Sequence, residues 1–149
     1  MTSGTSEAER MRALAAPVTG LARLLDIRTF LLHAAILDVE AAEELREIEA
    51  VNTRLGVGRD GRNITCQFEH DFLVKGKNEV DALELKVNIG ALFEFPAEHE
   101  PEGCITEENM VAFGQTTAQH AVHPYLRVAV SDLTSRLGCP RLTLGLLSD

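Results

Sequence analysis

The chain has 149 residues, 45% of them hydrophobic, which suffices for one compact domain with its own core. Fourteen basic against 23 acidic residues give a formal charge of −9, which repels phosphate backbones and excludes nucleic acid as an expected partner. Three cysteines without a CxxC pair, a polar start and no apolar run of about 20 residues predict a reduced, cytoplasmic protein without membrane insertion.

The first 26 residues are expected to form a tail with one short helix. Residues 7–16 have a helical composition, and Pro17 is expected to stop the helix. Residues 27–39 are too uniformly apolar to alternate, which suits a strand covered on both sides or a buried helix, and we favour the strand. These features predict a tail over 1–26 and one folded domain over 27–149.

The segment 41–57 fits two structures. Leu45, Ile48 and Val51 are spaced as in a helix, whereas Ile48, Ala50 and Asn52 alternate as in a strand. The choice between helix and strand stays open at this stage.

Two later segments alternate regularly between apolar and polar residues, as half-buried strands do. Residues 63–75 put Ile64 to Val74 on one face at every second position, and His70 belongs to that face. Residues 83–95 repeat the pattern. Asp60-Gly61 predicts a hairpin in front of the first of these strands, so a meander is expected.

Helices are predicted after a polar, proline-bearing crossover loop over 97–103. Thr106 is a favourable N-cap, and Pro124 predicts the start of a second helix that ends near Gly138. Strands first and helices afterwards predict an α+β fold. We therefore expect a four-stranded antiparallel sheet, a meander, followed by two helices packed on one face.

Residues capable of chemistry occur without the spacing that chemistry needs. A zinc site would have to use Cys104, His120, His123 and Cys139, which contain no CxxC or HxxxH pattern. A triad of Ser131, His123 and Asp132 would require two adjacent helical residues to point the same way. We expect no catalytic residue, no metal and no cofactor.

Residues 123–144, HPYLRVAVSDLTSRLGCPRLTL, resemble a motif of the SecB family. In that motif Pro-Tyr-x-Arg opens a helix, Ser-Asp/Asn-Leu-x-x-Arg continues it, and Gly-x-Pro-x-Leu-x-Leu follows. Residues 87–93, VNIGALF, resemble the Val-x-x-x-Gly-x-Phe stretch of the family's last strand, with one shift at the aromatic position.

The resemblance implies a homotetramer, a dimer of dimers, that holds unfolded or nascent polypeptides without ATP. The family binds these clients on apolar grooves near the crossover loop and the helices. Carried to this sequence, the implied client-binding residues are Phe93, Phe95, Ile105, Met110, Phe113 and Leu137.

One departure from the family affects the expected partner. The segment that docks the SecA motor carries Leu-x-Glu in the family, whereas Lys86 reverses the charge here, so docking to SecA is doubtful. The chain is more similar to actinobacterial SecB-like proteins, some of which accompany toxin–antitoxin pairs, and this similarity implies an antitoxin as a candidate client. The alternatives are a small α+β ligand-binding domain or thioesterase-like enzyme, and a binding partner dedicated to one antitoxin.

Overall fold

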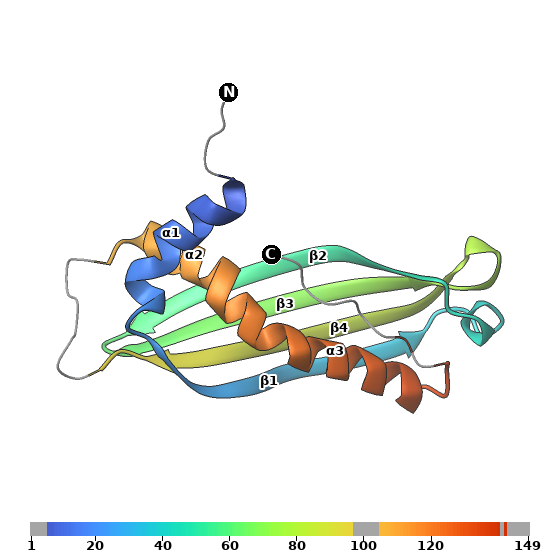
Figure 1. The fold of residues 1–149 in the computed structure, drawn as a ribbon. Helices are drawn as coiled ribbons and strands as arrows, with labels where there is room; N and C mark the ends of the chain where they lie inside the picture. Colours follow the sequence, from blue (N-terminus) through green and yellow to red (C-terminus); the bar gives the residue numbers. More distant parts are fainter. Residues whose placement is uncertain (1–5, 97–104, 141, 143–149) are drawn as a thin grey trace, which may run out of the picture.

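The computed structural model describes residues 6–96, 105–140 and 142. A twisted four-stranded sheet carries helices across one face (Figure 1). The elements, in chain order, are α1 (Glu7–Thr19), β1 (Arg23–Ile36), β2 (Glu47–Asp60), β3 (Asn63–Lys75), β4 (Asp81–Glu94), α2 (Glu107–Phe113) and α3 (Gln119–Arg136). The predicted α+β fold is confirmed, while the predicted crossover over 97–103 lies outside the described residues.

The strands lie in the order β1-β4-β3-β2, and every neighbouring pair is antiparallel. β2, β3 and β4 form the predicted meander, with the expected hairpin at Gly61, whose φ is +61°. β1 differs from a simple meander because it lies beside β4. The chain returns from β1 to β2 through a short 3-10 turn, Ala41–Glu43, to which the Asp38 carboxylate contributes by accepting from the Ala41 N–H at 2.9 Å.

The segment 41–57, for which the sequence left helix and strand undecided, is mostly strand. A bulge between Ala50 and Asn52 shifts the register of β2 against β3, so Ile48 and Leu55 face the helices although they are seven positions apart. A bulge adds one residue to one strand and interrupts its period of two. This is the reason that neither strand nor helix spacing dominated in the sequence.

The core lies between the sheet and the helices. The alternating positions of β3 and β4 are buried on this face as predicted, with Leu85 and Ile64 fully enclosed. α3 packs on β4 and β1, and its Leu126 and Val130 close the core from above. The segregation of apolar side chains to one face of the sheet thus produces the two-layer arrangement.

The N-terminal helix is part of this core. Pro17 was expected to stop α1, but the helix continues to Thr19. Val18 is fully buried and Asn109 of α2 donates to the Leu14 carbonyl at 2.8 Å, so contact with α2 stabilises the last turn beyond the proline. The expected boundary at residue 27 falls inside β1, which begins at Arg23.

The two predicted C-terminal helices are joined without a loop into one continuous helical segment. Thr106 caps α2 as expected, accepting from the Asn109 N–H at 3.1 Å. A π-helical segment, Gly114–Ala118, then joins α2 to α3, and Pro124 lies inside α3 instead of starting a helix. Proline removes one backbone donor, and burial of Val122 and Leu126 on either side holds the helix on the sheet despite that loss.

Candidate polypeptide-binding site

β2 borders a groove on the helix side of the sheet. It is the outermost strand next to β3, so its outer backbone N–H and C=O groups are not paired with another strand of the described sheet. Between β2 and α2 lies a hollow of about 780 Å³, which we call the edge groove. It is lined by Thr53, Arg54, Leu55, Val57, Gly58, Arg59, Phe68, Glu107, Met110, Val111, Gln115 and Gln119.

The floor of the edge groove is fixed by close packing of the helix on β2. A Cβ added at Gly114 would lie 2.9 Å from a methyl of Leu55 and 3.0 Å from one of Val57, so glycine permits this approach. Arg59 places its guanidinium 5.0 Å from the centre of the Phe95 ring and donates to the Gly61 carbonyl at 2.9 Å. Arg59 therefore forms one wall of the groove and covers an aromatic core residue.

This arrangement suits an extended polypeptide. A free strand edge offers main-chain hydrogen bonds to any sequence, while adjacent apolar pockets take alternate side chains. Val111 remains 39% exposed beside Met110, so apolar surface is available in the groove. Burial of such surface contributes roughly 25 cal/mol per Å².

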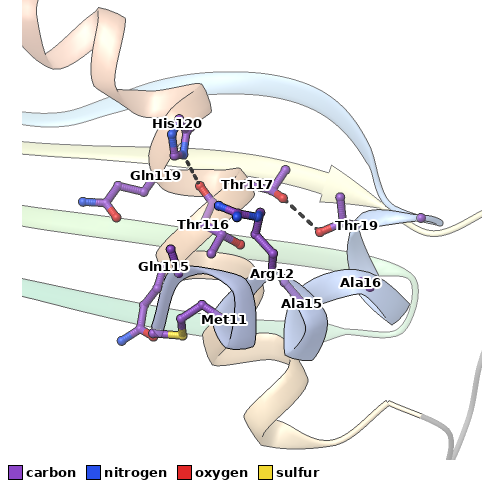
Figure 2. Close-up of a pocket in the computed structure, with 12 residues that line it drawn as sticks. Met11, Arg12, Ala15, Ala16, Thr19, Gln115, Thr116, Thr117, Gln119 and His120 are labelled. Carbon is purple, nitrogen blue, oxygen red and sulfur yellow. Dashed lines mark hydrogen bonds between the residues drawn. The ribbon is translucent and has the colours of Figure 1, made fainter. Parts of the chain in front are cut away.

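A second hollow of about 900 Å³, which we call the helix pocket, lies between α1 and the π-helical segment with the first residues of α3 (Figure 2). Thr19 and Thr117 join its two sides by a hydroxyl hydrogen bond of 2.9 Å. Gln115 and Gln119 line both hollows, so the edge groove and the helix pocket adjoin. The lining residues are Ala8, Met11, Arg12, Ala15, Ala16, Thr19, Gly20, Gln115, Thr116, Thr117, Gln119 and His120.

The implied client-binding residues do not form one surface. Phe93 and Phe113 pack edge to face in the core, with ring centres 4.7 Å apart, and Phe95 is fully buried. Ile105 is half-buried in front of α2. Of the six implied residues, Met110, which is 8% exposed, is the one that lines the edge groove.

Leu137 lies far from that groove. It follows α3, 24 residues after Phe113, which corresponds to about 36 Å along a helix. There it lines a separate shallow hollow with Ile36, Val39 and Cys139. A client touching both Met110 and Leu137 would have to extend along the whole helix.

Sequence reasoning missed most of the edge groove and of the helix pocket. Leu55 and Val57 belong to the segment whose structure stayed open, and Met11 and Arg12 belong to the expected tail. The alternation Leu55-Gly56-Val57-Gly58 was the one available signal, because it presents apolar side chains on one face only.

His70 is held in a stack of rings on the core face of β3. Its ring is nearly parallel to those of Phe68 and Phe72, at centre distances of 6.4 and 5.6 Å. Burial lowers the pKa of His70, nearby His123 on α3 lowers it further, and Asp71 raises it. The neutral imidazole is thus an element of the packing, as expected for a buried histidine.

Stability is expected to fall as the pH drops below about 6.5, the unperturbed histidine value, toward the lower folded-state pKa of His70. In that range the unfolded chain binds the proton first, which favours unfolding. Urea denaturation between pH 7 and 5 would measure the slope. His70→Leu should flatten it, and equal slopes in both proteins would contradict this account.

No group of three or more potential metal ligands occurs among the residues that the structure describes. Cys104 lies outside them, and Cys139 follows the far end of α3 from His120. Ser131 and His123 are eight residues apart on that helix, about 12 Å, and Asp132 pairs with Arg136 at 2.9 Å. Nowhere in the described ranges does a helix have the length and hydropathy of a membrane span.

Comparison with known proteins agrees with this geometry. No family model matches the chain. Two curated relatives, the SecB-like chaperones Rv1957 and MT2006 from two strains of Mycobacterium tuberculosis, are each 41% identical over 68 residues, which make up 46% of this chain. The match spans 37% of the length of either relative.

The fold match is more extensive. A solved structure of the Mycobacterium tuberculosis SecB-like chaperone Rv1957, in complex with a ChAD peptide from the Rv1956 HigA1 antitoxin, has a TM-score of 0.79 at 27% identity. The alignment covers 93% of this chain and 99% of that one. The resemblance that residues 123–144 predicted is therefore confirmed, and the chain is SecB-like in sequence over 68 residues and in fold over nearly its whole length.

Proposed function

We propose that the protein is an ATP-independent holding chaperone in the cytoplasm, and not an enzyme, which binds an unfolded or nascent polypeptide in the edge groove. The observation that carries the proposal is the adjacency of an unpaired strand edge and an apolar hollow. Weak sequence selectivity follows, because backbone groups supply part of the binding energy. The antitoxin peptide bound by Rv1957 supports an antitoxin as the client.

We further propose that the functional particle is a homotetramer, a dimer of dimers, with β1 as the first contact between copies. β1 is the other edge of the sheet, and its Phe30, Leu31 and Leu32 are about half exposed. A long apolar edge strand favours association with another chain. Association along β1 would leave the opposite edge at β2 accessible to a client, and sedimentation of the purified protein measures the mass of the assembly.

The SecA motor is not part of the proposal. Lys86 lies opposite Asp71 of β3 and His33 of β1, on the sheet face away from the helices. An exposed cation at this position opposes a partner that recognises a carboxylate there.

Val111→Asp is expected to weaken client binding about tenfold, because it places a charge in the apolar part of the groove. Light scattering of rhodanese diluted from guanidinium, with and without the protein, measures the holding activity. Val128→Asp is the matched control, since Val128 is 68% exposed on α3 and lines neither the edge groove nor the helix pocket. If the wild-type protein did not suppress rhodanese aggregation, the proposed function would be refuted. If both variants were equally active, the client would bind outside the edge groove.

A further inference from the structure

The helix pocket combines apolar walls with one exposed cation. The α1 side consists largely of alanine and methionine side chains, of which Ala15 is buried and Ala16 is open to the hollow. Arg12 extends from α1 beside these residues, on the side where Thr116 and Thr117 lie (Figure 2). A ligand in this pocket would therefore meet apolar surface and a guanidinium together.

Arg12 has no partner among residues 6–96, 105–140 and 142, either by hydrogen bond or by ion pair. Arg10, two residues earlier on the same helix, pairs with Glu7 at 2.8 Å. In a chain of net charge −9, a guanidinium that has no partner in the described ranges and lies beside apolar surface is complementary to a carboxylate on an apolar ligand.

The helix pocket also continues the edge groove. Gln115 and Gln119 line both hollows, so a chain leaving β2 can cross these two side chains and enter the pocket at α1. Their amides can donate to and accept from a peptide backbone at the crossing. The π-helical segment Gly114–Ala118 begins at this crossing, and π turns often mark functional sites.

We propose that the helix pocket is a second anchoring site for the same client and takes a large apolar side chain that neighbours a carboxylate, which pairs with Arg12. The inference rests on the proposed function and adds the chemistry of the client. The preferred segment is extended, has alternating apolar side chains for the edge groove, and carries an apolar residue next to Asp or Glu where it reaches α1.

Two fluorescein-labelled peptides test the charge requirement. Both contain the same strand-forming Val/Thr sequence and an amidated C-terminus, and they end in Phe-Glu or Phe-Lys, so that the charge of the last side chain distinguishes them. Fluorescence anisotropy with the full chain should show about threefold tighter binding of the Phe-Glu peptide, typical of an exposed ion pair. Arg12→Glu should reverse the preference, whereas Arg10→Glu, which changes the net charge equally on the same helix outside the pocket, should preserve it.

Filling the pocket tests the apolar requirement. Ala16→Leu should weaken binding of both peptides about tenfold, because the leucine occupies the space of the client's anchor. Ala13→Leu, on the same helix and outside the pocket, should leave binding unchanged. Thermal melts of all variants check that the fold is retained.

The outcomes separate this inference from the proposed function. Unchanged preference in Arg12→Glu together with unchanged affinity in Ala16→Leu overturns the inference, while a loss of binding in Val111→Asp still supports the edge groove. A change in the mass of the assembly in Ala16→Leu, without a change in peptide affinity, would assign the pocket to a contact between copies and also overturn it. Failure of the wild-type chain to bind either peptide overturns both proposals.

Discussion

Replacement of Phe113 by alanine is expected to lower the free energy of unfolding by about 4 kcal/mol. The side chain is fully buried and meets the edge of the Phe93 ring at a centre distance of 4.7 Å and an angle of 74°. Truncation leaves a cavity and removes the contact between the rings, both of which destabilise the fold. Urea denaturation followed by circular dichroism at pH 7.5 measures the change.

Phe113→Leu is the control, because it keeps most of the apolar volume and should cost about 1.5 kcal/mol. Binding of a client should be lost only to the extent that the protein unfolds. If Phe113→Ala kept its stability and lost the client, Phe113 would be a contact residue, as the family resemblance implied, and its assignment to the core would be wrong.

Gly76→Ala is expected to destabilise the protein by about 2 kcal/mol or more. A Cβ at this buried position would collide with backbone atoms of Ala41 and Glu44, which belong to the connection between β1 and β2. Backbone atoms cannot move aside as the end of a flexible side chain can, so the turn after β3 would have to separate from the 3-10 turn. Thermal unfolding of the variant provides the measurement.

Gly58→Ala serves as the comparison. A Cβ at position 58 would meet nothing within 4 Å, and no positive φ restricts the residue. Its stability should therefore stay within about 0.5 kcal/mol of the wild type or rise slightly. Equal melting temperatures for the two glycine variants would contradict the close approach at Gly76.

The strand segments that could be predicted from the sequence are those whose pairing contains no register shift. β3 alternates strictly between buried and less buried residues from Ile64 to Val74, and the segment of β4 paired with it, Leu83 to Phe93, departs from this alternation at Gly90, which lies against Phe30. The apolar faces predicted for these two segments are therefore buried residue by residue. β1 contains two register shifts and β2 one, and each reverses the side chains that follow it. Local sequence does not display such a shift, because the partner strand determines where it falls.

The site was harder to predict than the fold. Aromatic residues near a crossover can face a client or the core, and Phe93 and Phe113 face each other. Their burial depends on the helix lying over β4, which is a contact between distant segments. No pattern in the sequence singled out Arg12, because the pocket that it lines forms only when α1 packs beside α2.

Figure 1 shows α2 and α3 following one another across the sheet. The π-helical segment Gly114–Ala118 that joins them limits which changes of chain length the fold can accept. A π turn holds one residue more than an α turn, and each residue rotates a helix by about 100°. Deletion of one residue there would rotate Leu126, Val130 and everything beyond them away from β4. Homologous chains in which both α2 and α3 contact the sheet must therefore keep the number of residues between Phe113 and Val122, whatever those residues are.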